Sequence, residues 1–116
     1  PSTTSTAGMI GAARIACMKP NAVLINVGRG TVIDENALVL ALRERRILGA
    51  ALDVFAREPL PSGHPLFSLD NVLLSPHTAD RTPGWLDRAM QVFTGNLEAW
   101  LSGGELKNIV DKQAGY

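Results

Sequence analysis

The chain of 116 residues has little of what marks several protein classes. Its single cysteine, Cys17, cannot form an internal disulfide and lies in an apolar stretch, which favours a reduced core residue. No run reaches the roughly 20 apolar residues of a membrane helix, and the N-terminus lacks the pattern of a secretory signal. The 11 basic and 11 acidic side chains balance, without a block of either sign. We therefore expect a soluble, cytoplasmic protein with no nucleic-acid or membrane partner.

The chain also lacks the Gly-x-Gly-x-x-Gly fingerprint that holds dinucleotide phosphates between a strand and a helix. Gly28 and Gly30 have no third glycine after them and do not directly open a helix. Apolar residues make up 46% of the chain and charged residues 19%, so the chain can form a packed core and its composition does not indicate disorder. This length fits one small domain or part of a larger one.

Helical and strand patterns alternate along the chain, and no internal repeat or low-complexity tract interrupts them. Alternation of this kind predicts an α/β fold, with a largely parallel sheet and flanking helices. Proline-rich residues 58–65 predict a loop between the last two strands. The expected elements are a helix over 9–18, a strand over 22–27, a helix over 35–46, strands over 50–55 and 71–75, and a long amphipathic helix over 83–101. Residues 1–6 are expected to form a polar loop. Asp34 is expected to cap the helix over 35–46 and Gly49 to close it, with an inward face of Leu38, Ala41 and Leu42. Thr82 is expected to cap the last helix, and Gly103 and Gly104 to end it.

The first strand has the strongest pattern in the chain. Its branched apolar residues are interrupted only by Asn26, which predicts a strand buried on both faces of a parallel sheet. It runs into Gly28-Arg29-Gly30, where two glycines free the backbone to turn and let another molecule come close. The carboxyl end of a parallel strand is where ligands bind in open α/β sheets. Arg29 therefore offers a planar fork of donors to a carboxylate or a phosphate.

The other two strands also lead into charged or polar residues. Asp53 lies within the second expected strand and Glu58 follows it, and His77 follows the third. Parallel strands would gather these side chains with Arg29 at one edge of the sheet. An arginine, a carboxylate and a histidine together can bind an anionic substrate and move a proton.

Three spaced motifs resemble the D-isomer-specific 2-hydroxyacid dehydrogenases. They are residues 22–30 (AVLINVGRG), residues 50–59 (AALDVF followed by Glu-Pro after two residues) and residues 74–79 (LSPHTA), in the family's order. The resemblance covers nearly the whole chain. It implies half of a Rossmann-like parallel sheet with flanking helices, namely the C-terminal half of a dinucleotide-binding domain over 1–101 with the long helix 83–101, and a C-terminal tail over 102–116.

The same resemblance implies a reaction and a set of site residues. The activity would be hydride transfer between NAD or NADP and a small 2-keto or 2-hydroxy acid, in a homodimer of the full-length protein. Arg29 would hold the substrate carboxylate, His77 would be the general acid and base, and Glu58 would favour the protonated imidazole. The cofactor would be contacted by Val27, Gly28, Arg29, Asp53, His77 and Ala79.

Alternatives stay open for several residues and for the whole chain. Asp53 could be a structural acid satisfied by the backbone, and Glu58 a solvated loop acid. His64, between glycine and proline, is expected to be a surface turn residue. Asp80 stands where many relatives have glycine, which bears on the subfamily. The chain could also be a dinucleotide-sensing module or an assembly fragment without catalysis.

Overall fold

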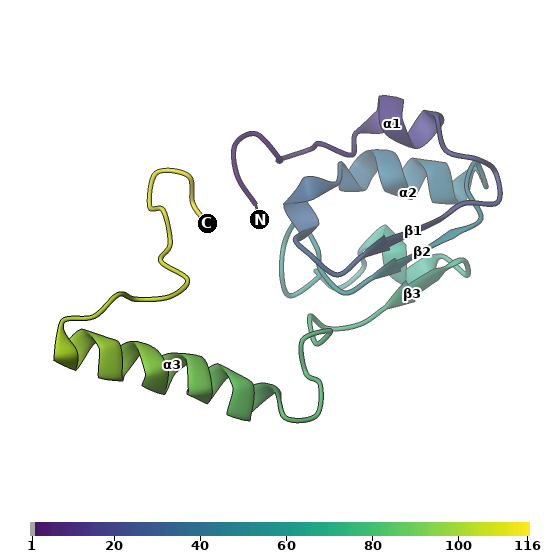
Figure 1. Cartoon of the computed structure of the whole chain (residues 1–116). Coiled ribbons are helices and arrows are strands. Elements are labelled where there is room, and N and C mark those ends of the chain that lie inside the picture. Colours follow the sequence, from purple (N-terminus) through teal and green to yellow (C-terminus); the bar gives the residue numbers. More distant parts are fainter. Residues whose placement is uncertain (1) are drawn as a thin grey trace. The chain divides into compact units, whose positions relative to one another are not determined.

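The computed structural model describes residues 2–116 and divides the chain into two compact units. The first ends at Ala79 and the second is Asp80–Tyr116. In Figure 1 the first unit contains the sheet, and the second contains one long helix. The elements are α1 (Ala12–Ala16), β1 (Val23–Asn26), η1 (Gly30–Val32), α2 (Glu35–Arg43), β2 (Gly49–Leu52), η2 (Pro65–Ser68), β3 (Val72–Leu74) and α3 (Trp85–Ser102).

The three strands form a parallel sheet, as the alternating pattern predicts, and their order in the sheet is β1-β2-β3. Leu24 pairs with Ala50, and Ala50 in turn pairs with Val72. The connection from β1 to β2 runs through α2, whereas the connection from β2 to β3 contains only the short 3₁₀ helix η2. All three strands therefore end at the same edge of the sheet, where the predicted site residues follow them.

Helices α1 and α2 lie on the same side of the sheet (Figure 1). Asp34 begins α2 as predicted, because its side chain accepts a hydrogen bond from the backbone N–H of Ala37 at 3.1 Å. The predicted inward face of this helix is confirmed. The buried core joins α1, α2, η2 and one face of the sheet through Ile15, Leu24, Leu38, Ala41, Leu42, Ala50, Leu52 and Leu66.

The prediction that the first strand is buried on both faces is wrong for this chain. Leu24 points into the core and is 8% exposed, but Ile25 on the opposite face is 68% exposed. Leu73 of β3 shares that open face and is 71% exposed. The apolar run does form a strand, but within the first unit helices cover only one of its two faces.

Several element boundaries differ from the sequence-based expectation. The region expected to form a helix over 9–18 is helical only over Ala12–Ala16, since Ile10 forms a parallel bridge with Ile33. Helix α2 ends at Arg43 rather than near Arg46, and Gly49 belongs to β2 instead of closing the helix. Strand β2 ends before Asp53, and Cys17 is exposed rather than in the core.

The second unit is built around α3, which ends at Ser102 with the predicted Gly103 as its C-cap. Its first residue is Trp85, with Gly84 as N-cap in the left-handed region, so Thr82 is not the cap. Asn96 bonds the backbone of Lys107 through both its Oδ1 and its Nδ2, at 2.8 and 3.0 Å, and so ties the tail to α3. None of the helices over residues 2–116 has the length and apolar character needed to cross a membrane. Of the expected polar loop over 1–6, Pro1 lies outside the described residues.

Candidate active site

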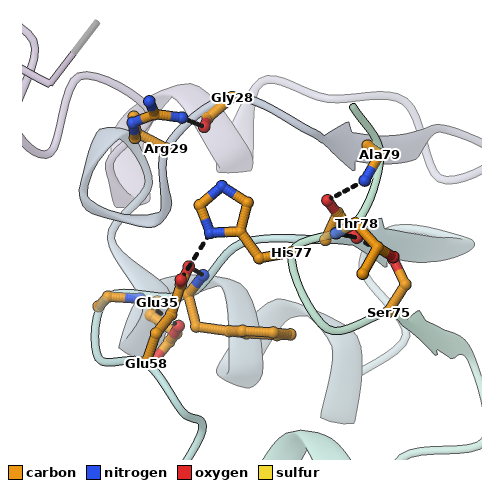
Figure 2. Close-up of polar contacts among 11 residues, drawn as sticks. Gly28, Arg29, Glu35, Glu58, Ser75, His77, Thr78 and Ala79 are labelled. Atoms are coloured by element: carbon orange, nitrogen blue, oxygen red, sulfur yellow. Dashed lines mark hydrogen bonds and ion pairs between the residues drawn. The ribbon is translucent and has the colours of Figure 1, made fainter. Parts of the chain in front are cut away.

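The turn after β1 is shaped by Asn26, the polar residue inside the apolar strand. Its Oδ1 accepts from the backbone N–H of Gly28 at 3.1 Å, and its Nδ2 donates to the carbonyl of Arg29 at 3.0 Å. Arg29 itself donates one bond, from Nη1 to the carbonyl of Gly28 at 2.7 Å (Figure 2). Its side chain is exposed, so most of the guanidinium remains available to an anion.

Gly30 brings the Arg29 turn into direct contact with the segment after β2. A Cβ at this position would lie 1.9 Å from the carbonyl carbon of Phe55 and 2.5 Å from the nitrogen of Ala56. Only a glycine permits two backbones to approach so closely. The sequence predicts a close approach by another molecule here, and the structure shows that Gly30 receives a segment of its own chain.

Glu58 and His77 are brought together from different strand ends. The Nδ1 of His77 lies 2.7 Å from Glu58 Oε2, while Glu58 Oε1 accepts from the backbone N–H of Phe55 at 2.9 Å. Figure 2 shows the imidazole pointing at Glu58, and its Nε2 has no hydrogen-bond partner among residues 2–116. The hydrogen bond from His77, followed by the one from Phe55, holds the pKa of the Glu58 carboxyl below its ordinary value.

Asp53 is buried, with 3% exposure, and its carboxylate holds the loop that carries His77. It accepts from the hydroxyl of Ser75 and from the backbone N–H groups of Thr78 at 3.0 Å and Ala79 at 2.8 Å. His77 adopts a φ of 52°, in the left-handed region that is unfavourable for a residue with a Cβ. The bond from Ser75, then that from Thr78, keep the pKa of Asp53 below its ordinary value.

An apolar cavity of about 390 Å³ opens beside the Glu58–His77 pair. A small organic acid could place its carbon chain there while its polar end meets the imidazole. The cavity is lined mainly by apolar side chains, with the pair at one side, and the lining includes Phe55, Pro59, Leu60, Phe67, Leu74 and Pro76.

The prediction that His64 is a surface turn residue is wrong, because its side chain is only 18% exposed. Its Nε2 lies 3.3 Å from Oε1 of Glu35, and Glu35 Oε2 accepts from the backbone N–H of Ala56 at 3.1 Å. No motif in the sequence singles out Glu35 or Ser75 as part of this region. The nearest signals were the position of Glu35 at the start of a helix and that of Ser75 two residues before His77.

The remaining predicted contacts lie at the same edge of the sheet. Val27 and Gly28 are exposed directly after β1, and Ala79 is bonded to Asp53 at the end of the first unit. The described residues contain no group of three or more His, Cys, Asp or Glu side chains arranged to hold a metal ion. What this edge presents is an exposed guanidinium, a carboxylate–imidazole pair and main-chain groups, which together can bind an anion and transfer a proton.

Comparison with known proteins gives consistent results. The profile described as "D-isomer specific 2-hydroxyacid dehydrogenase, NAD binding domain" matches residues 1–79. A glyoxylate/hydroxypyruvate reductase B of Pectobacterium carotovorum is 46% identical over 113 residues, covering 97% of this chain and 35% of that protein. A glyoxylate reductase of Thermofilum pendens is likewise 46% identical over 97% of this chain and 33% of the relative.

Solved structures are also similar to this chain. A D-isomer specific 2-hydroxyacid dehydrogenase from Xanthobacter autotrophicus, in complex with NADPH and MES, superposes with a TM-score of 0.90 at 42% identity, covering 100% of this chain and 47% of that one. An NADPH-dependent glyoxylate/hydroxypyruvate reductase from Sinorhizobium meliloti, with NADP and malonate, has a TM-score of 0.85 at 40% identity over 98% of this chain and 35% of its own. The predicted fold, half of a Rossmann-like α/β sheet with flanking helices, is confirmed. The chain spans about a third of the length of these curated relatives.

Proposed function

Because this chain belongs to the D-isomer specific 2-hydroxyacid dehydrogenase family, we propose that it is the C-terminal part of an oxidoreductase that acts on small 2-keto or 2-hydroxy acids. The enzyme would transfer a hydride between NAD or NADP and a substrate such as glyoxylate or hydroxypyruvate. The observation that supports this most directly is the 2.7 Å contact between Glu58 and His77 at the carboxyl edge of a parallel sheet.

In the reducing direction, His77 supplies the proton. Hydride adds to the carbonyl carbon, the C=O π electrons move to oxygen, and the Nε2–H of the protonated imidazole is transferred to that oxygen. Nδ1 is already engaged by Glu58, so Nε2 is the nitrogen left to face the substrate. The reverse reaction uses the neutral imidazole as base, with all steps inverted.

Glu58 acts on the proton donor of this step, and Arg29 acts on the substrate. The ionised Glu58, whose pKa is lowered by the hydrogen bond from His77, stabilises the positive imidazolium that reduction consumes. Arg29 presents its exposed fork to the substrate carboxylate, where two parallel N–H···O bonds would fix the position of the carbonyl. Proximity of this kind converts a random encounter into an oriented reaction.

The residues present fit the nicotinamide end of the cofactor rather than its phosphates. The nicotinamide ring would be bordered by the exposed turn at Val27, Gly28 and Arg29 and by the loop at His77 and Ala79. Asp53 would contribute by holding that loop through its bond to Ala79. When bound, the dinucleotide supplies or accepts the hydride. No Gly-x-Gly-x-x-Gly turn is present in residues 1–116, so the pyrophosphate would be held by another part of the protein.

The test is keto-acid reduction by the complete protein, followed as loss of NADH or NADPH absorbance. We expect glyoxylate or hydroxypyruvate to be reduced, and His77→Ala to lower kcat by about 10²–10⁴ fold while dinucleotide still binds. His64 is unsuitable as a control because it is paired with Glu35 beside this site, so Asp70→Asn, on an exposed surface ion pair, serves instead. Dinucleotide binding without any hydride transfer would favour the sensing module over the enzyme.

We further propose that the complete protein is a cytoplasmic homodimer. The balanced charge of the chain and the open apolar face of its sheet, which includes Ile25 and Leu73, are in keeping with packing against further protein. Light scattering of the complete protein measures its mass directly. A monomer across the micromolar range would refute the dimer and leave the reaction unaffected.

A further inference from the structure

A second glutamate–histidine pair lies outside the set proposed to act on the substrate. Glu35 is the first residue of α2, and His64 immediately precedes η2. Oε1 of Glu35 and Nε2 of His64 are 3.3 Å apart, and each side chain is 18% exposed. Glu58 and His77, by comparison, are 34% and 45% exposed. The second pair is thus the more enclosed of the two, as expected for a group that holds structure rather than meeting solvent.

The two glutamates hold successive amides of one turn. The backbone N–H of Phe55 donates to Glu58 at 2.9 Å, and the next N–H, that of Ala56, donates to Glu35 at 3.1 Å. Gly30 packs against the same peptide. Figure 2 shows both glutamates at this turn, with the imidazole of His77 above Glu58. Any shift of the Phe55–Ala56 peptide would therefore also move the adjacent N–H of Phe55, which is bonded to Glu58.

His64 keeps the Glu35 carboxylate in place. Its Nδ1 accepts from the backbone N–H of Leu66 at 3.3 Å, so the neutral ring carries its proton on Nε2, facing Glu35. Its own backbone N–H donates to the carbonyl of Pro61 at 3.1 Å. The far end of the loop that carries Glu58 is thereby tied to the start of α2.

We propose that Glu35, held by His64, is a positioning residue for the reaction: it fixes the turn at Phe55 and Ala56 and so sets the Glu58–His77 hydrogen bond. This inference rests on the proposed reductase function. A simpler role for Glu35 is a favourable charge at the N-terminus of α2. That role would stabilise the helix without any dependence on Glu58, and the two accounts give different kinetics.

The experiment is a double-mutant cycle in the complete protein. Glu35→Ala should lower kcat for keto-acid reduction about tenfold, with little change in KM for the dinucleotide, because the turn rather than the cofactor site is disturbed. In a Glu58→Gln background the same substitution should cost less than about twofold, since the group it positions is already lost. Glu44→Ala, at the exposed C-terminal end of α2, is the matched control and should change neither value.

Glu35→Gln covers the case in which Glu35→Ala does not fold. Its amide oxygen can still accept from Ala56, so its kcat should fall between those of the wild type and the alanine variant. If Glu35→Ala lowers kcat by the same factor in the wild type and in the Glu58→Gln variant, the proposal is overturned and only the role of Glu35 as a charge at the start of α2 is left.

Hydrogen exchange of residues 53–60 separates this proposal from the reductase assignment. Glu35→Ala should accelerate exchange there and Glu44→Ala should not, whether or not the protein reduces any keto acid. Unchanged exchange would overturn the positioning role on its own. If exchange is accelerated but the protein reduces no 2-keto acid, Glu35 still fixes the turn at Phe55 and Ala56, and the reductase function is rejected.

Discussion

Gly30→Ala is the substitution for which the structure predicts the largest effect from one methyl group. The new Cβ would lie 1.9 Å from the carbonyl carbon and 2.0 Å from the carbonyl oxygen of Phe55, where ordinary contacts exceed about 3.4 Å. Both obstacles are backbone atoms, so no side chain can rotate away. One of the two segments must move by more than about 1 Å, and overpacking of this kind costs about 2–3 kcal/mol of unfolding free energy.

The displaced Phe55–Ala56 peptide donates to Glu35 and follows directly on the Phe55 N–H that donates to Glu58, so the loss should be catalytic as well as structural. Denaturant unfolding of the complete protein measures the first effect and kcat/KM the second. Gly28→Ala is the control for stability, since its Cβ would meet only Asn26 Oδ1 at an ordinary 3.5 Å. If Gly30→Ala and Gly28→Ala unfold at the same denaturant concentration, the close approach of the two segments is refuted.

Three further predictions concern the site itself. Arg29→Lys should lower kcat/KM by at least about thirtyfold, or ~2 kcal/mol, because an ammonium cannot form the paired bonds of a guanidinium; a near-normal rate on glyoxylate and hydroxypyruvate would rule the role out. Glu58→Gln removes the carboxylate whose pKa His77 lowers, so the basic limb of the pH–rate profile for reduction should move to lower pH, and an unmoved limb contradicts the coupling. The pKa of Asp53 lies below 3.8 in the folded protein, so its stabilisation is present above that pH and is lost as pH falls. Asp53→Asn should therefore unfold at neutral pH in less denaturant and flatten the acid side of the stability curve, with faster exchange of residues 75–79; Asp70→Asn, on an exposed pair, is the control.

Much of the fold follows from local patterns in the sequence. The alternation of apolar runs and capped helices predicts that β1, β2 and β3 run parallel, because parallel strands require crossover connections between them. Asp34 marks the start of α2 by the same short-range chemistry in the sequence and in the structure. The expected helix over 9–18 was shortened where a partner distant in sequence takes the backbone groups, as Ile33 does for Ile10. Burial of Cys17 and of both faces of β1 could not be predicted, because burial depends on what packs against a segment.

The residues proposed to act on substrate were found in the sequence because they follow strand ends within motifs. That placement brings Glu58 and His77 to one edge of the sheet, and the structure adds their 2.7 Å contact. What only the tertiary structure decided is the support behind them. Asp53 holds the His77 loop, and Glu35 and His64 brace the turn of Glu58 from residues that carry no motif of their own. Hydrogen-bond acceptors act over about 3 Å, so the partner of a backbone amide is set by the packing of segments and leaves no periodic signal in the chain.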